Sequence, residues 1–281
     1  MELYLQVEVV AGVGKWNLGG VKMRILVING SRHKGNTWAY YEEAKHAIEQ
    51  STQTEVDFEE INLLKADIPF CIGCQKCFIE GEEACPHYEK IHEISHKIET
   101  SDGVIILSPA YSLGVSAVVK NLIDHMSYNY HRPRFFGKKV MIICTTLGRG
   151  AKECRKYLHD VFMFWGFNHT YNLDFAMAFM PELKPSKKAL GETRKIAIKF
   201  YKDISSNKTY RPSAKRIFYY NMWRSLSTLG TPKKNADNRY WLESGLRKTP
   251  FDKRIPIWPW QALWGNMLYR IVGKIVKKSY Q

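Results

Sequence analysis

The chain has 281 residues, enough for one large domain or for a domain with a substantial appendage. Its formal net charge is +15, and 45% of its residues are hydrophobic, an ordinary fraction for a globular protein. No apolar run reaches the roughly eighteen residues that a membrane-spanning helix needs, and no secretory signal is visible, so the sequence favours a cytoplasmic protein.

The positive charge is concentrated in residues 205–281, whereas the rest of the chain is nearly balanced. A basic segment of this kind fits nucleic acid, an anionic membrane surface or an anionic cofactor. No recognised nucleic-acid-binding motif accompanies the charge, so we predict no specific nucleic-acid partner.

Residues 1–22 show no clear periodicity and end in two glycines and a Val-Lys pair. Met23 then begins a clear strand pattern, and an α/β domain normally begins with such a strand. We therefore treat 1–22 as an N-terminal extension, which is either a weakly ordered arm or sequence that precedes a true start at Met23.

From Met23 onward, short apolar runs alternate with helical periodicities. The expected strands cover 23–29, 54–61, 103–107, 139–145 and 168–175. The expected helices cover 37–50, 91–98, 115–126, 152–165 and 185–201. Continuous apolar strands that alternate with helices predict a parallel, doubly wound α/β sheet in residues 23–204.

Four cysteines lie within fifteen positions after the second expected strand, in the loop 71–85: Cys71, Cys74, Cys77 and Cys85. Their C-x2-C-x2-C spacing, followed by a more distant Cys-Pro, resembles the iron–sulfur ligand run of bacterial ferredoxins. A [4Fe–4S] cluster, a cysteine loop without metal and a zinc site all remain open. The other two cysteines, Cys144 and Cys154, are expected to be core residues.

The first strand runs directly into Gly30–Thr37, which precedes a helix. Glycines and hydroxyls at a strand–loop–helix junction direct backbone N–H groups at an anion. The loop nearly matches a nucleoside-triphosphate P-loop, but Asn36 stands where the phosphate-binding lysine belongs. A phosphate monoester therefore suits it better than a triphosphate; an ordinary capped turn is the alternative.

These residues lead to a family resemblance that covers about 23–200. Gly30–Thr37 resembles the FMN-phosphate loop of flavodoxin-like NADPH-dependent FMN reductases. Ser108–Gly114 with the following helix, and Thr145–Gly150, resemble the second and third FMN loops of that family. The cysteine run lies where the iron–sulfur flavoprotein branch of the family carries its cluster motif.

The resemblance implies a flavodoxin-like, five-stranded parallel sheet of order 2-1-3-4-5, an FMN cofactor and a [4Fe–4S] cluster bound by the four cysteines of loop 71–85. No catalytic side chain is implied, since the flavin carries the chemistry. The implied FMN-binding residues are Ser31, Arg32, Gly35, Asn36, Thr37, Ser108, Pro109, Ala110, Tyr111, Gly114, Thr146, Leu147 and Gly148. The histidines, among them His125 and His131, show no ligand spacing and are interpreted as structural or surface residues.

The leading functional hypothesis is an FMN-dependent oxidoreductase that passes electrons between NAD(P)H or a reduced carrier and an acceptor, by way of the cluster. The partner would be NAD(P)H, a ferredoxin, a quinone or another small molecule. The alternatives are a non-enzymatic electron-transfer flavoprotein and a cluster-free NAD(P)H:FMN or quinone reductase.

Residues 205–281 form a basic, aromatic-rich and mostly helical C-terminal extension. In 259–278, apolar side chains recur with helical spacing: Trp260, Leu263, Trp264, Met267, Leu268, Ile271, Val272, Ile275 and Val276. An apolar stripe of this length needs a cover. We expect protein to supply it, either the same chain or a second subunit in a homo-oligomer, most simply a dimer; peripheral contact with an anionic membrane is the alternative.

Overall fold

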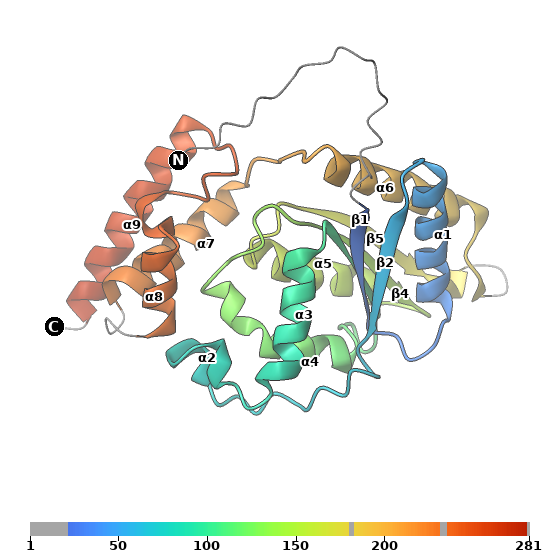
Figure 1. The fold of residues 1–281 in the computed structure, drawn as a ribbon, viewed down its shortest axis with the longest axis horizontal. Coiled ribbons are helices and arrows are strands. Elements are labelled where there is room, and N and C mark those ends of the chain that lie inside the picture. Colours follow the sequence, from blue (N-terminus) through green and yellow to red (C-terminus); the bar gives the residue numbers. More distant parts are fainter. Residues whose placement is uncertain (1–21, 180–182, 231–234, 280–281) are drawn as a thin grey trace, which may run out of the picture.

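The computed structural model describes residues 22–179, 183–230 and 235–279, and a five-stranded parallel sheet of order β2-β1-β3-β4-β5 forms its centre (Figure 1). The N-terminal extension proposed from the sequence lies, apart from Lys22, outside these residues. The sheet order and the parallel pairing confirm the doubly wound, flavodoxin-like fold that the sequence predicts.

The elements follow the expected alternation. The strands are β1 (Met23–Asn29), β2 (Val56–Asn62), β3 (Gly103–Pro109), β4 (Lys139–Thr146) and β5 (His169–Ala176). The helices of this body are α1 (Asn36–Gln50), α2 (Lys76–Ile79), α3 (Tyr88–Thr100), α4 (Ala117–His125), α5 (Ala151–Phe164) and α6 (Lys187–Ser205). Each of the ten predicted elements is present, with boundaries that differ by a few residues at most.

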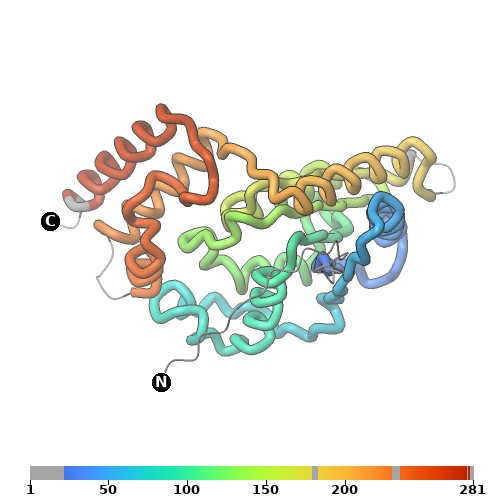
Figure 2. The backbone as a smooth tube through the Cα atoms, turned by 45° about the horizontal axis from the view of Figure 1, so that its top comes forward, coloured from blue at the N-terminus to red at the C-terminus, as the bar shows by residue number. Residues whose placement is uncertain are grey.

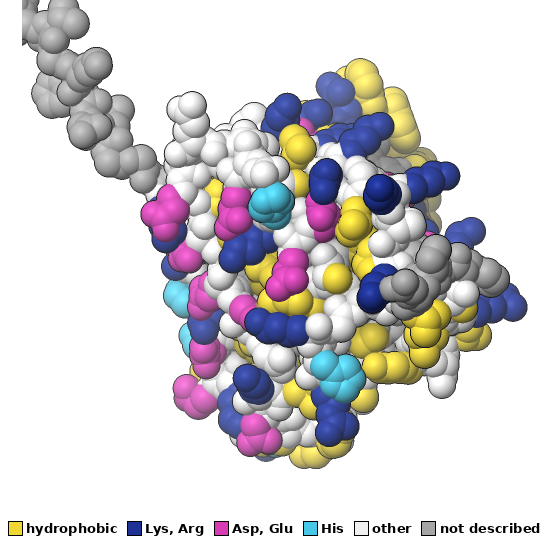
Figure 3. Space-filling view, turned by 90° about the vertical axis from the view of Figure 1, so that its right-hand side faces the viewer, with side chains coloured by type: hydrophobic (Ala, Val, Ile, Leu, Met, Phe, Trp, Pro, Cys, Tyr) yellow, Lys and Arg dark blue, Asp and Glu magenta, His cyan; other side chains and the backbone are white. Residues whose placement is uncertain are grey.

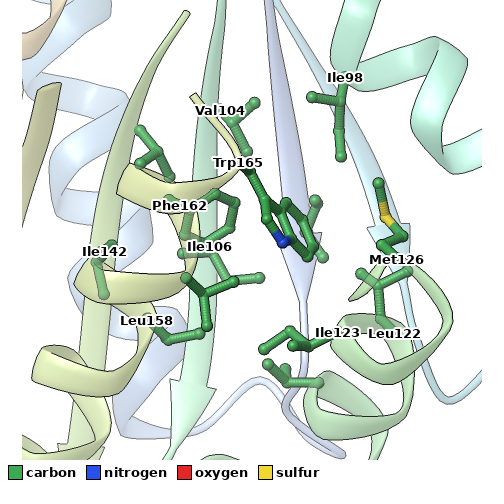
Figure 4. Close-up of a cluster of buried hydrophobic side chains, with 14 of the residues drawn as sticks. Ile98, Val104, Ile106, Leu122, Ile123, Met126, Ile142, Leu158, Phe162 and Trp165 are labelled. Carbon is green, nitrogen blue, oxygen red and sulfur yellow. The ribbon is translucent and has the colours of Figure 1, made fainter. Parts of the chain in front are cut away.

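Two hydrophobic cores hold the layers together, one on each face of the sheet. On one face, α1 and α6 pack beside each other over Ile25, Val27 and their neighbours. On the other, α3, α4 and α5 bury a cluster around Trp165 and Phe162 at the end of α5 (Figure 4). Because the central strands β1, β3 and β4 are covered on both faces, their sequences are continuously apolar instead of alternating.

The C-terminal extension consists of α7 (Ala214–Ser225), a π-helical turn (Leu226–Gly230), α8 (Ala236–Glu243) and α9 (Pro259–Ser279), all at one end of the body (Figures 1 and 2). Its own core includes a side chain from the body, Phe136, which packs with Ile217, Tyr220, Trp241, Phe251 and Ile255. The body and the extension therefore share buried surface, and the domain boundary expected near residue 204 stays a prediction.

A buried cation fastens α7 to the body. Arg216 is 6% exposed and donates hydrogen bonds to the carbonyl oxygens of Gly166, Phe167 and Asn168, just after the end of α5. Carbonyl groups at a helix C-terminus attract positive charge, so the guanidinium can be buried here without a carboxylate partner. Burial lowers the pKa of Arg216 to about 10, which still leaves it charged at neutral pH.

The long apolar stripe of α9 is divided in the structure. Gln261, Gly265 and Gly273 are buried on the side that faces α7, and Trp264 packs against the extension's core. Leu263 and its helical neighbours lie on the outer side. The sequence places Gln261 outside the covered stripe, but its amide donates to the Pro212 carbonyl and is part of the packed side. Gln261 is buried because the glycines of α9 let α7 approach closely on this side, where a side chain would have kept the two helices apart.

Within the described ranges, no helix combines the length and the apolarity that crossing a bilayer requires. The oligomer expected from the sequence stays a prediction.

His169 makes the stability of the fold depend on pH. Its ring stacks on Tyr210 with centroids 4.0 Å apart, and burial, together with Lys199, lowers its pKa to about 4. An unfolded histidine has a pKa near 6.5, so the neutral ring contributes its full stabilisation above about pH 6.5 and loses it as the pH falls towards 4. We expect the free energy of unfolding, measured with urea, to fall over this interval.

His169→Phe keeps an aromatic ring for the stack and removes the titrating group. We expect the variant to lose less stability than the wild type between pH 6.5 and pH 4, and the two proteins should be compared first at pH 7.5 as a reference. Equal slopes in the two proteins would assign the pH dependence to other groups.

Candidate functional site

Three loops meet at the carboxyl edge of the sheet, after β1, β3 and β4. The first and second are joined because Gly30 N donates to Leu107 O at 2.9 Å and Ser116 Oγ donates to Gly30 O at 2.9 Å. The second and third are joined by Ala110 N, which donates to Thr145 O at 2.7 Å. The strand order thus brings together loops that lie far apart in the sequence.

The first loop ends at the N-terminus of α1. Gly35 is the N-cap, no side chain caps the helix, and no acidic residue lies in its first turn. The first N–H groups of a helix have no partner within it, so those of Asn36, Thr37 and Trp38 are available to an anion. The Thr37 hydroxyl lies 2.5 Å from that of Thr145, which ties the first loop to the third.

Gly30 has to be a glycine at the joint between the loops. A Cβ there would lie 2.2 Å from Val119 Cγ2 and 2.9 Å from both Leu107 O and Ser116 Oγ. The Ser31 hydroxyl donates to the His33 carbonyl, and the Ser31 N–H to the Asn29 side chain. These contacts hold the loop in one shape before any ligand binds.

The second loop contains a tight turn. Tyr111 and Gly114 exchange two backbone hydrogen bonds, and the two residues between them, Ser112 and Leu113, both have positive φ (49° and 67°). A leucine in this region of backbone space is strained, and such strain is kept where neighbouring structure enforces it. Gly150 supplies that neighbour: its backbone lies so close that a Cβ would be 2.9 Å from Leu113 Cα.

Large apolar side chains are exposed on these loops. Tyr111 is 62% exposed, Leu113 52% and Leu147 64%. Three such side chains from two loops, beside an anion-binding helix end, suit a ligand that has a flat apolar ring system at one end and a phosphate at the other. FMN has both parts, a flat ring system and a phosphate, so the residues present fit that cofactor.

A cleft of about 560 Å³ opens beside the first loop, between it, the end of β2 and α3. It is mostly basic, since its lining includes Arg32, His33, Lys34, Lys65, Lys90 and Lys97. Lys97 and Lys90 pair with Glu93 and Asp67, respectively, whereas no described acidic residue pairs with Arg32 or Lys65. The cleft thus offers further positive charge close to the phosphate loop.

The loop 71–85 leaves β2 at the same edge of the sheet. Asn121 on α4 anchors its start, because its side chain accepts from Cys71 N at 2.9 Å and donates to the Ile68 and Pro69 carbonyls. Gly73 and Gln75 both have positive φ, so the backbone turns sharply between the cysteines.

The four cysteines of loop 71–85 differ in exposure. Cys71 and Cys74 are exposed, and Cys77 and Cys85 are half-buried. Burial raises the pKa of Cys77 to about 11, Arg132 opposes the rise, and negative charge on Cys85, Cys71 or Cys74 adds to it. Without metal, Cys77 stays protonated at neutral pH, so a metal centre has to displace that proton.

A buried arginine connects this loop to the C-terminal extension. Arg132, 1% exposed, donates to Cys77 O at 2.7 Å, to Glu82 at 2.9 Å and to Asp237 of α8 at 2.8 Å. Burial alone would raise the pKa of Glu82, but Arg134 and Arg132 outweigh it and hold the pKa below its ordinary value. Figures 1 and 2 both show α2 beside α8, as these contacts require.

The structure brings together one group of possible metal ligands that the spacing of residues in the sequence does not show. The ligand atoms of Cys85, His87 and His125 all lie within 4.8 Å of one another. His125 Nε2 lies 2.9 Å from Pro69 O, which can only accept, so Nε2 carries the proton and Nδ1 faces Cys85 Sγ at 3.8 Å with a lone pair. His87 Nδ1 is buried and has no hydrogen-bond partner in the described part of the chain.

This group offers His125 a second role besides the structural one expected from the sequence, and the structural interpretation stays a prediction. A tetrahedral zinc ion separates a sulfur and a nitrogen ligand by about 3.6 Å, close to the distance seen here. The signal was absent from the sequence because His125 is forty residues from Cys85 and reaches it only through the packing of α4. His131, by contrast, bonds Asp237 and stacks on Trp223, which agrees with a structural role.

The predicted phosphate-loop and second- and third-loop residues thus converge at one edge, although contact with a ligand remains a prediction for each. The sequence places Thr145 and Gly150 in the third loop but not among the expected binding residues; Thr145 bonds both neighbouring loops, and Gly150 lies against Leu113. Their position directly after the apolar run of β4 was the sequence feature that could have marked them as site residues.

Comparison with known proteins gives a consistent picture. The family model described as NADPH-dependent FMN reductase matches residues 23–181. An iron–sulfur flavoprotein of Archaeoglobus fulgidus is 33% identical over 146 residues, which are 51% of this chain and 64% of that protein. One from Methanocaldococcus jannaschii is 40% identical over 104 residues, 36% of this chain and 51% of that protein.

The matched part therefore spans about half to two thirds of the length of these iron–sulfur flavoproteins. A quinone reductase of Escherichia coli is 27% identical over 146 residues, 51% of this chain and 71% of that protein. Among solved structures, an azoreductase of Bacillus anthracis superposes with a TM-score of 0.50 at 16% identity, covering 63% of this chain and 100% of that one; this likeness concerns the fold alone.

The Arg132 contacts predict a large stability effect. Arg132→Met leaves the buried Asp237 without its arginine partner and the half-buried Glu82 with Arg134 alone, and breaking a buried ion pair from one side costs about 3–5 kcal/mol. We expect a loss of that size in the free energy of unfolding and faster proteolysis of loop 71–85.

Lys120→Met is the matched control, because it removes one cation from an exposed pair with Asp124 that is worth about 0.3–0.5 kcal/mol. If the two substitutions had similarly small effects, the buried network would not hold the loop and the extension together.

Proposed function

The chain belongs to the NADPH-dependent FMN reductase family, and we propose that it is an FMN-dependent oxidoreductase that passes electrons between NAD(P)H or a reduced carrier and an acceptor. One observation carries the proposal: three interlocked loops present an uncapped helix N-terminus and exposed apolar side chains at the same edge of the sheet. Ligands of open parallel sheets bind at this edge.

We assign the phosphate of FMN to Ser31, Arg32, Gly35, Asn36 and Thr37. Backbone N–H groups of the first turn of α1 donate to it, and Arg32 adds positive charge. The ring system is assigned to the second and third loops, that is, to Ser108, Pro109, Ala110, Tyr111, Gly114, Thr146, Leu147 and Gly148. Bound FMN supplies hydride and single-electron transfer; the loops orient it and shield it from water.

The substrates follow from the same surfaces. The basic cleft beside the phosphate loop suits the phosphates of a pyridine nucleotide, because Arg32 and Lys65 face it without a described acidic partner. Exposed Tyr111 and Leu147 suit a flat acceptor. A quinone or another aromatic acceptor agrees with the name of the quinone reductase relative.

We further propose that Cys71, Cys74, Cys77 and Cys85 bind a [4Fe–4S] cluster. Two observations support it: the four cysteines lie in one loop and form no disulfide, and two relatives bear the name iron–sulfur flavoprotein. The group of Cys85, His87 and His125 supports a competing assignment, a single zinc ion. Both need Cys85, so one chain holds one or the other.

Asn36→Asp tests the flavin site. The side chain of Asn36 is half-buried and has no described hydrogen bond, and aspartate is favourable in the first turn of a helix. We expect the variant to keep its stability but to bind FMN at least tenfold more weakly, because the carboxylate repels the phosphate. FMN released from purified protein and the dissociation constant by fluorescence give the readouts.

Asn207→Asp, which adds the same charge at an exposed turn after α6, should leave FMN affinity unchanged. Unchanged affinity in Asn36→Asp as well would mean that the loop is an ordinary turn. Steady-state NAD(P)H oxidation with a quinone acceptor then separates an enzyme from a passive electron carrier.

Metal analysis of protein purified without oxygen tests the cysteine site. We expect about four iron and four sulfide per chain, both lost in Cys74→Ala, with His87→Ala retaining the iron. Zinc near one per chain, retained in Cys74→Ala and lost in His87→Ala, would favour the Cys85–His87–His125 site. Neither result bears on FMN binding, which is measured on the same samples.

A further inference from the structure

The orientation of α9 about its own axis is fixed by contacts along one side. Cβ atoms at Gly265 and Gly273 would lie 2.7 Å from Asn221 Nδ2 and 2.3 Å from Leu229 Cδ1, so the helix touches α7 and the π-helical turn directly. Ser225 Oγ also donates to Tyr269 O at 2.8 Å. The helix cannot roll without breaking these contacts, so its opposite face points outward.

That outward face is apolar. Trp260 is 53% exposed, Leu263 75%, Met267 49%, Ile271 44% and Ile275 61%. The five positions are three or four residues apart and form one row along the helix. A continuous apolar row on the rim of the molecule is unusual for a surface that faces only water.

Apart from Pro259 at its start, the other side chains of α9 that are described as exposed are cationic. Arg270, Lys274 and Lys278 are exposed, the helix contains no Asp or Glu, and none of these three cations has an ion pair in the part of the chain that the structure describes. The far end of the molecule differs, since acidic and basic side chains both occur on the face that Figure 3 shows. The face drawn in Figure 3 therefore lacks the single sign of charge that α9 has.

We propose that the outer face of α9 docks on the surface of an anionic lipid bilayer, with the helix lying in the plane of the interface. An amphipathic helix with an apolar row, tryptophans and cations meets both parts of such a surface, the acyl boundary and the negative headgroups. Figures 1 and 2 place α9 along the outer edge of the molecule, where the body does not stand in front of it.

Charge complementarity favours lipid over a second copy of the chain. Two α9 faces packed together would bury the apolar rows, but their cations would meet no carboxylate, because the helix has none. A bilayer that contains anionic lipid supplies the missing negative charge. At the N-terminal end, Trp258 is 48% exposed, and the Arg211 guanidinium lies 4.0 Å from its ring centroid, which extends the same combination beyond the helix.

Sedimentation of the full chain with lipid vesicles tests the proposal. We expect binding to vesicles of phosphatidylcholine mixed with phosphatidylglycerol, weakened by added salt, and little binding to phosphatidylcholine alone. Leu263→Gln should weaken binding roughly tenfold, because the variant loses the favourable free energy of burying one leucine side chain. Leu64→Gln changes another exposed leucine, 46% exposed and far from α9, and should leave binding unchanged.

Lys274→Glu should weaken binding at least fivefold, whereas Lys195→Glu on the exposed side of α6 should have a much smaller effect. Far-ultraviolet circular dichroism and FMN content show that each variant is folded. Equal binding to both kinds of vesicle, or no difference between Leu263→Gln and Leu64→Gln, would overturn the proposal. So would a dimer that Leu263→Gln dissociates and that does not bind vesicles, since a second copy would then cover the face.

Discussion

Parallel pairing of β1 with β3 and of β3 with β4 is the constraint on which the rest of the structure depends. Parallel strands all end at the same edge of the sheet, so the loops after Asn29, Pro109 and Thr146 lie next to one another. Their hydrogen bonds to one another, through Gly30, Ala110 and Thr145, then fix a surface that no single loop could form. The strain at Leu113 persists because the backbone of Gly150 lies directly against it.

The C-terminal extension is joined to this framework by buried cations instead of by a continuous sheet. Arg216 donates hydrogen bonds to carbonyl groups after α5. Arg132 binds a carboxylate on either side, Glu82 in the cysteine loop and Asp237 in α8. A buried guanidinium with several acceptors fixes geometry more than it adds stability, because its desolvation offsets much of the attraction. The extension therefore contacts the half of loop 71–85 that contains Cys77 through Arg132, and the metal proposed for this loop would be held partly by the extension.

Cys85 links two metal assignments that exclude each other. Its position in the chain groups it with Cys71, Cys74 and Cys77, whereas its surroundings include two imidazoles, one of which has its tautomer fixed by Pro69. The oxidoreductase chemistry proposed here depends on the flavin loops, so it does not require a decision between the two. The metal decides only whether electrons have a second, single-electron centre within the same chain.

Sequence alone determined the layered α/β fold, because continuous apolar strands that alternate with helices fit only a sheet covered on both faces. It also identified the Gly30–Thr37 junction and the cysteine run, since both are local patterns. It did not determine which side of α9 is buried: helical periodicity marks apolar positions, but the glycines at 265 and 273 select the contact with α7. Nor did it bring His125 to Cys85 or Arg132 to Asp237. Such encounters join residues forty or a hundred positions apart, and only tertiary packing decides them.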